Sequence, residues 1–231
     1  MCIIAIKPKG QKMFDQQTIR TMFANNPDGA GYMFCDGKQV IIRKGFMCVD
    51  TLLMSLSSQD LTNTNVVLHF RIGTSGKLDA LNCHPFPIYD KNKVCCKTDI
   101  ALAHNGILRG FEPSKKSPIN DTQNYIQLML KGLKKGFQND EGILNLIEYS
   151  IDGNRFAFLD SDNKVTLIGD FITDDGYIYS NWSFLPKKQK QADTLRGVST
   201  SKKKSEFDWL WDEDDEEYDD LWADIDRKWA R

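Results

Sequence analysis

The chain has 231 residues, of which 41% are apolar, and its formal net charge is −2. This length and composition are typical of one globular domain with an appendage. No apolar run approaches the roughly twenty residues that span a bilayer, and the charge is nearly balanced, so we expect neither a membrane nor a nucleic-acid partner.

The first half of the chain is expected to hold strands and short helices. Apolar runs rich in β-branched residues predict strands, and Asp36-Gly37 predicts a hairpin turn between two of them. The expected strands are Cys2–Ile6, Gly31–Phe34, Val40–Arg43 and Val66–Ile72. The expected helices are residues 15–24 and Val49–Leu56.

The second half repeats this mixture. Four strands are expected, at Ile100–His104, Arg155–Leu159, Val165–Ile168 and Tyr177–Ser180. Two helices are expected, at Asp121–Leu133 and Ile143–Tyr149. Asn120 is suited to cap the first of these, whose apolar positions are Ile126, Met129, Leu130 and Leu133. Strands in two groups with helices around them lack the regular alternation of a doubly wound sheet, which favours the α+β class.

The composition changes after Pro186. Residues 187–204 carry seven bases and one acid, and this predicts a basic linker. Residues 205–231 carry twelve acids, three bases and four tryptophans. Aromatic and apolar residues recur there at helical spacing, so this acidic tail is either a solvated segment or a helix that docks on a protein partner. The expected organisation is a domain at 1–186, the linker, and the tail.

The six cysteines are expected to be free thiols, because no secretory signal is visible and the cytoplasm is reducing. Adjacent Cys95 and Cys96 lack the spacing of a zinc site, and we expect no metal or cofactor. Cys2 differs from the others. Removal of Met1 leaves a thiol and an α-amine on one residue, and an amine with a pKa of about 7.7–8 can take the thiol proton without a histidine.

Five motifs then follow in a recognisable order. They are Asp28-Gly29-Ala30-Gly31, His69-Phe70-Arg71-Ile72-Gly73-Thr74-Ser75-Gly76, Asn82-Cys83-His84-Pro85, Ala103-His104-Asn105-Gly106-Ile107 and Asp121-Thr122. With an N-terminal cysteine before them, they resemble the glutaminase domain of the class II glutamine amidotransferases. The likeness covers about residues 2–186. It implies the four-layer αββα sandwich of the N-terminal-nucleophile hydrolases, with a charged tail added here.

The resemblance also implies how glutamine is held. Arg71 would pair with the α-carboxylate, which a guanidinium can bind through two parallel hydrogen bonds. Asp121 would pair with the α-ammonium, although its place in a first helical turn is also explained by the helix dipole. The loop residues Thr74, Ser75 and Gly76 would line the pocket, and Asp28–Gly31 resembles a mobile loop that closes over the substrate.

The implied reaction is acyl transfer from glutamine to the Cys2 thiol, with release of ammonia. Asn105 and Gly106 would form the oxyanion hole, through a side-chain amide and a backbone N–H. Water would then release glutamate. For His84 and His104 we expect structural roles, because a histidine among apolar residues is more often a satisfied core group than a base.

The sequence also departs from the family pattern. Ile3 replaces the glycine that follows the nucleophile in many members, and Ile72 and Ser75 replace a tryptophan and a histidine of the sugar-phosphate synthases. Instead of a synthase domain, a linker and a tail follow. Three readings stay open: a cytoplasmic glutaminase subunit that passes ammonia to a separate synthase, a stand-alone hydrolase of γ-glutamyl amides, and a non-catalytic interaction module.

Overall fold

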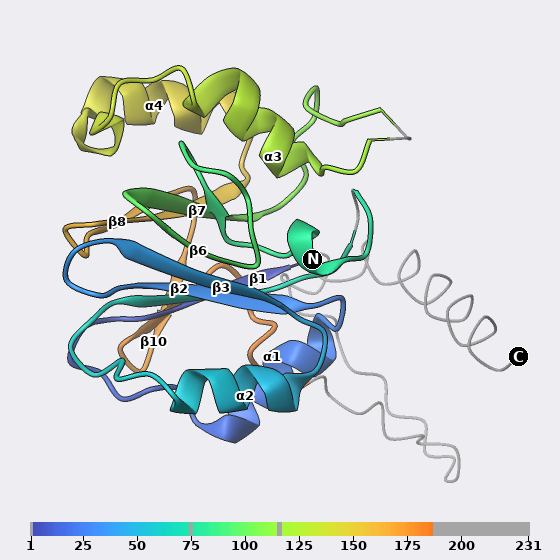
Figure 1. Cartoon of the computed structure of the whole chain (residues 1–231), viewed down its shortest axis with the longest axis vertical. Coiled ribbons are helices and arrows are strands. Elements are labelled where there is room, and N and C mark those ends of the chain that lie inside the picture. The colour runs from blue at the N-terminus through green and yellow to red at the C-terminus, as the bar shows by residue number, and fades with distance from the viewer. Residues whose placement is uncertain (1, 74–75, 115–116, 187–231) are drawn as a thin grey trace, which may run out of the picture. The chain divides into compact units, whose positions relative to one another are not determined.

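A computed structural model describes residues 2–73, 76–114 and 117–186, and they form two antiparallel sheets (Figure 1). The larger sheet has seven strands in the order β10-β11-β1-β4-β2-β3-β6. Its strands are β1 (Ile3–Lys7), β2 (Ala30–Cys35), β3 (Val40–Phe46), β4 (Val66–Phe70), β6 (Cys95–Thr98), β10 (Ile172–Asp174) and β11 (Tyr177–Tyr179). The smaller sheet has the order β5-β7-β8-β9, with β5 (Phe86–Pro87), β7 (Ile100–Asn105), β8 (Arg155–Asp160) and β9 (Val165–Ile168).

Helices cover the outer face of each sheet (Figure 1). α1 (Gln16–Asn25) and α2 (Val49–Ser57) lie against the larger sheet, whereas α3 (Asp121–Tyr125), η2 (Ile126–Leu130) and α4 (Glu141–Ser150) lie against the smaller one. Two short 3₁₀ turns, η1 (Ala80–Asn82) and η3 (Phe137–Asn139), complete the elements. The layers are therefore helix, sheet, sheet, helix, and the expected αββα sandwich is confirmed.

Three apolar clusters hold these layers together. Along β1, Ile3 and Ala5 pack toward α1 and α2, and Ile4 and Ile6 pack into the cluster between the two sheets. Side chains of a strand alternate between its faces, so a strand buried on both sides appears as a continuous apolar run. This is why β1 was readable from the sequence.

The strand β1 continues one residue further than expected. Lys7 is buried, and its ammonium group donates hydrogen bonds to the carbonyl oxygens of Leu61, Thr62 and Thr64. A buried lysine is tolerated when its donors are satisfied in this way. The strand therefore includes Lys7, the charged residue that was expected to follow it.

The expected helix Asp121–Leu133 is not one regular α-helix. Its α-helical part ends at Tyr125 and a π-helical turn follows, in which Lys131 N–H donates to Ile126 C=O at 2.8 Å. The wider turn shifts the helical phase. Ile126 and Leu130 are therefore buried, but Met129 is 43% exposed instead of facing the core.

Three further strands were not expected. β5 and β10 are two and three residues long, and β6 is a mostly exposed edge strand that begins with Cys95 and Cys96. Short or exposed strands carry little hydrophobic periodicity. The remaining elements agree with the expectations to within a few residues, including the Asn120 cap, whose side chain accepts the Gln123 N–H.

Among the described residues, no helix is both long enough and apolar enough to cross a bilayer. The same residues contain no group of three or more histidine, cysteine or acidic side chains placed to hold a metal ion. The expected linker at 187–204 and the acidic tail at 205–231 lie outside the described residues.

Candidate active site

Cys2 lies immediately before β1, facing the residues that follow β4. Its thiol donates to the Ile72 carbonyl oxygen at 3.4 Å, and the Ile72 N–H lies 3.3 Å from Sγ. The side chain of Asn181 donates to the Cys2 carbonyl oxygen at 2.7 Å. Burial raises the pKa of the Cys2 thiol, and the backbone of Ile72 only partly opposes this. At neutral pH the resting thiol is thus protonated, and its attack on a substrate requires a base.

The expected substrate-binding charges line the same pocket as Cys2. Arg71 and Asp121 are both buried, and with Gly106 they contribute to its wall. The other lining residues are Ile72, His84, His104, Asn120 and Thr122. The pocket holds about 20 Å³, enough for about one water molecule, so glutamine would have to widen it.

Each of the two charges is held by backbone groups. The Arg71 guanidinium donates to the Lys77 carbonyl oxygen at 3.0 Å, and Asp121 accepts the Leu108 N–H at 2.9 Å. Asp121 is the first residue of α3, where a carboxylate is favoured by the helix dipole. The two explanations for Asp121 are therefore compatible.

The other expected pocket residues are placed as follows. Thr74 and Ser75 lie outside the described residues. Gly76 has a φ of 73° and sits against Asn120, so that a Cβ on it would lie 3.1 Å from the Asn120 Cβ. Both the positive φ and the nearby Asn120 side chain favour glycine at position 76.

The segment Asp28–Gly31 is hydrogen-bonded to the residues that follow β4. Asp28 N–H donates to the Arg71 carbonyl oxygen at 3.0 Å, and the Asp28 carboxylate accepts the Gly73 N–H at 2.8 Å. Arg71 N–H in turn donates to Gly29 C=O. Ala30 and Gly31 already belong to β2. Gly31 was expected to begin this strand, so the strand starts one residue earlier than expected, and Ala30 belongs to it instead of to a loop.

The expected oxyanion residues lie where β7 ends. Asn105 is fully buried, and its side-chain nitrogen donates to Ser180 Oγ at 2.9 Å. Gly106 follows with a φ of 140°, and a Cβ there would lie 1.6 Å from Asn154 Oδ1. No other residue fits at position 106 without displacing Asn154.

The three histidines of the chain form one buried group, in which His84 and His104 line this pocket. The ring centroids of His69 and His84 are 4.2 Å apart, and those of His84 and His104 are 6.1 Å apart. Thr122 Oγ1 joins two of them, at 3.1 Å from His84 Nε2 and 2.7 Å from His104 Nδ1. His104 Nε2 is 3.1 Å from Asn154 Oδ1.

The hydrogen-bond partners fix the protons of this group. Asn154 donates from Nδ2 to the carbonyl oxygens of Ile107 and Ile151, so its Oδ1 must accept from His104 Nε2–H. His104 Nδ1 then accepts the Thr122 hydroxyl proton, and Thr122 accepts His84 Nε2–H. All the imidazoles are neutral, and burial lowers the pKa of each. The structural roles expected of His84 and His104 fit this network.

The sequence analysis assigned no role to His69, Asn154 or Ser180. His69 opens one of the five motifs and Ser180 ends an expected strand, whereas Asn154 lies in neither a motif nor an expected element. His69 Nε2 donates to the His104 carbonyl oxygen at 2.9 Å. The packing of the two sheets brings these side chains to their partners, and the sequence alone does not show that packing.

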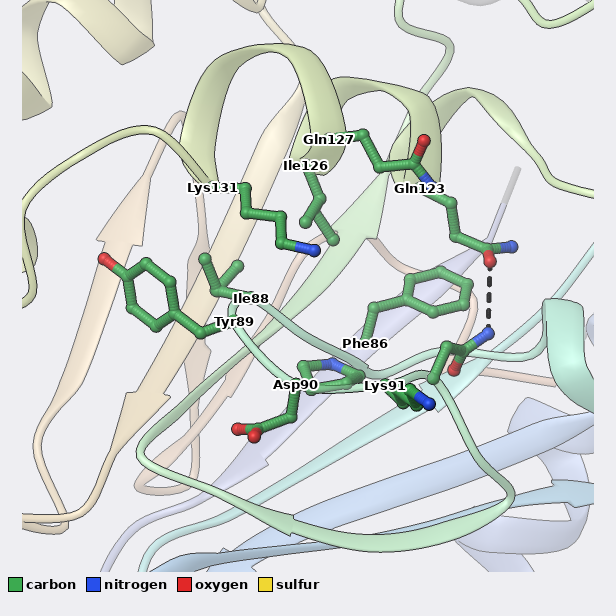
Figure 2. Close-up of a pocket in the computed structure, with 11 residues that line it drawn as sticks. Phe86, Ile88, Tyr89, Asp90, Lys91, Gln123, Ile126, Gln127 and Lys131 are labelled. Atoms are coloured by element: carbon green, nitrogen blue, oxygen red, sulfur yellow. Dashed lines mark hydrogen bonds between the residues drawn. The ribbon is translucent and has the colours of Figure 1, made fainter.

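A larger hollow lies away from this pocket (Figure 2). It holds about 370 Å³ between the segments 86–92 and 123–131, and the Asn92 side chain donates to Gln123 at 3.1 Å on its wall. Its described lining includes none of the residues expected to catalyse or to bind glutamine. The Cys2 thiol, the Arg71 guanidinium and the Asp121 carboxylate lie in the smaller pocket instead.

Comparisons with known proteins agree with this geometry. The family described as class II glutamine amidotransferases matches residues 14–149, more than half of the chain. The chain is 29% identical over 132 residues to the isomerizing glutamine–fructose-6-phosphate aminotransferase of Thermococcus kodakarensis. That match covers 55% of this chain but 18% of the relative, so this chain corresponds to a minor part of that protein.

Two solved structures match parts of this chain at low similarity. The glutamine phosphoribosylpyrophosphate amidotransferase of B. subtilis, solved with ADP and GMP, has a TM-score of 0.48 at 17% identity, covering 78% of this chain and 41% of that one. A structure described as the allosteric regulatory enzyme of purine biosynthesis has a TM-score of 0.39 at 17% identity, covering 70% and 36%. Family membership follows from the sequence match.

The matched segment contains most of the site but not all of it. Arg71, Asn105, Gly106 and Asp121 lie within residues 14–149, whereas Cys2 precedes them. The structure brings Cys2 into one pocket with Arg71, Gly106 and Asp121. The chain belongs to the class II glutamine amidotransferases, a family of enzymes.

Proposed function

We propose that this protein hydrolyses the side-chain amide of glutamine to glutamate and ammonia, and that the ammonia passes to a separate synthase. One observation carries the proposal: a thiol, a buried guanidinium and a buried carboxylate share one small pocket. A free amino acid presents a carboxylate and an ammonium group, and Arg71 and Asp121 are complementary to that pair. The amide would then extend toward Cys2.

The reaction proceeds through a covalent intermediate on Cys2. With Met1 removed, the α-amine of Cys2 takes the thiol proton, and sulfur attacks the amide carbon. The oxyanion is stabilised by Asn105 and by the Gly106 N–H. The protonated amine gives its proton to the leaving nitrogen, ammonia departs, and a γ-glutamyl thioester remains. Water, activated by the same amine, then hydrolyses the thioester to glutamate and restores the thiol.

The direct test is ammonia release from L-glutamine by protein whose Met1 is shown by mass spectrometry to be absent. Protein that keeps Met1 serves as the inactive comparison, because its α-amine is not on Cys2. Brisk release without a partner would favour a stand-alone γ-glutamyl amide hydrolase. Release only with a synthase present would favour a subunit, and no release in either case would favour a non-catalytic module.

Replacing Arg71 by lysine should raise the KM for glutamine about tenfold to a hundredfold, with a much smaller effect on kcat. Lysine keeps the charge but loses one of two parallel hydrogen bonds, and a charge-assisted bond is worth about 1.5–3 kcal/mol. Steady-state kinetics measure this. Arg20→Lys is the matched control, since Arg20 lies on α1 in an exposed ion pair with Asp50. An unchanged KM would contradict the assignment of Arg71.

We also propose residues 1–186 as the catalytic domain and residues 205–231 as a docking segment for the partner. Deleting residues 205–231 should leave ammonia release unchanged within about twofold, because none of the site residues belongs to them. The same deletion should abolish retention of a synthase that co-purifies with the full chain. Equal retention by the full and shortened chains in a pull-down would sink the docking role.

A further inference from the structure

The hydroxyl of Ser180 bridges the two sheets beside Asn105, the residue that precedes Gly106 of the pocket. Ser180 follows β11, and its oxygen accepts the Ile4 N–H of β1 at 2.8 Å. The same oxygen is 2.9 Å from the side-chain nitrogen of Asn105, at the end of β7. One side chain thus touches the strand that begins directly after Cys2 and the residue proposed to stabilise the oxyanion.

The bridge is buried and fixed by the backbone. Ser180 is 2% exposed, and Asn105 and Ile4 are fully buried. Ser180 N–H donates to the Ile4 carbonyl oxygen at 3.0 Å, which extends the pairing of β1 with β11. Because the backbone holds residue 180 at this place, its hydroxyl has a defined position from which to orient the Asn105 amide.

The polar atoms of the bridge are not fully paired in this arrangement. Ser180 Oγ accepts from both neighbours, while the buried Asn105 Oδ1 has no hydrogen-bond partner among the residues that the structure describes. An unpaired buried acceptor costs about 1–3 kcal/mol in general. A hydroxyl also carries one proton that it can donate.

Turning the amide by 180° would give the Asn105 oxygen a partner and would move the unmet hydrogen-bonding capacity to the amide nitrogen. The nitrogen and oxygen of an amide are nearly alike in shape, so the exchange needs no other movement. Ser180 would then donate its proton to Asn105 Oδ1 and still accept the Ile4 N–H. Both amide hydrogens of Asn105 would be left for a ligand, and an oxyanion is the ligand that needs them.

We propose that Ser180 is a positioning residue, whose hydroxyl holds the Asn105 amide with its N–H groups available to the developing oxyanion. The inference rests on the proposed function of Asn105. The oxyanion exists only after attack, so a misplaced amide weakens transition-state stabilisation while the binding of glutamine is unchanged.

The test is a double-mutant cycle of Ser180→Ala and Asn105→Ala, in protein lacking Met1. Ser180→Ala should lower kcat about tenfold to a hundredfold with KM unchanged, within the 10²–10³-fold loss expected for Asn105→Ala. In the Asn105→Ala background, Ser180→Ala should cost less than about twofold. Ser180→Thr, which keeps a hydroxyl, should retain more activity than the alanine variant. Additive losses, or full activity of Ser180→Ala, would overturn the proposal.

A second measurement does not depend on activity. The side-chain amide signals of Asn105, assigned by their loss in Asn105→Ala, should shift in the NMR spectrum of Ser180→Ala. Unmoved signals would show that the hydroxyl does not orient the amide. If the protein lacking Met1 releases no ammonia although these signals do shift, the bridge is real and the proposed function is what fails.

Discussion

Replacing Cys2 by alanine should abolish ammonia release from glutamine, with a loss on the order of 10⁶-fold in kcat. Removal of a hydrolase nucleophile has a cost of that size because its partners act as a unit with it. Alanine is as small as cysteine, so removal of Met1 should proceed in both proteins and leave the same α-amine. The comparison therefore isolates the thiol. Ammonia release is followed beside mass spectrometry of each N-terminus.

The controls are the other cysteines. Cys48 is exposed, and Cys35 is buried beneath the far end of β2, where its thiol donates to the Ser161 carbonyl oxygen. Neither lines the pocket that holds Cys2, so Cys48→Ser should keep full activity. A γ-glutamyl thioester trapped by rapid acid quench should add the mass of a glutamyl group to wild-type protein only. Equal activity of Cys2→Ala and wild type would exclude Cys2 as the nucleophile.

Much of the fold could be predicted because burial leaves a direct mark on the sequence. Strands such as β1, β4 and β7 are enclosed by a sheet on one side and helices on the other, so nearly every residue is apolar. β6 lies at an edge and is largely exposed, and its sequence therefore has no such run. The π turn at Ile126 was equally invisible, since a change of helical phase alters no residue type.

The residues of the candidate site also fall into two groups, those that the sequence predicted and those that it did not. Arg71, Asn105, Gly106 and Asp121 stand in local motifs beside strand or helix ends, and resemblance alone predicted them. Their supporting residues come from distant segments: Ser180 is 75 positions from Asn105. Asn154 is 50 positions from His104 and accepts a hydrogen bond from its ring. The Asn154 side chain also leaves no room for a Cβ at Gly106. Such pairs depend on how the two sheets pack, and the spacing of residues in one sequence does not encode that packing.

The stability of the protein should fall steeply as the pH is lowered from 7 to 5. Burial lowers the pKa of His69 to about 3 and that of His84 well below its ordinary value, and it also lowers the pKa of His104. In the unfolded chain each histidine titrates near pH 6.5. Below that pH the unfolded state binds protons that the folded state cannot, so stability is present above pH 6.5 and is lost as the pH falls.

The geometry makes protonation costly for a second reason. A charged His104 would donate from both ring nitrogens, but its Nδ1 faces the hydroxyl of Thr122, which already accepts from His84. The positive charges of Lys44 and Arg71 also oppose a charge on His84. The histidines should therefore stay neutral until the protein unfolds.

Each histidine that stays neutral in the folded protein should lower the free energy of unfolding by about 2 kcal/mol between pH 7 and pH 5. His69 and His84 together account for about 4 kcal/mol, and His104 adds to this. Asp36 and Lys44 affect stability mainly outside the range from pH 7 to pH 5. The pKa of Asp36 is lowered to about 2, so its contribution is lost below pH 4, and the pKa of Lys44 is lowered to about 7, so stability gained from its deprotonation appears at higher pH.

Urea unfolding at pH 7, 6 and 5 measures this loss, with the dependence on denaturant checked at each pH. His69→Gln is the matched variant. Whatever it costs at pH 7, it removes one titrating group, so its loss between pH 7 and 5 should be smaller than that of wild type by about 2 kcal/mol. A free energy of unfolding that stays level over this range would mean that the folded protein takes up these protons, which the burial of the three rings opposes.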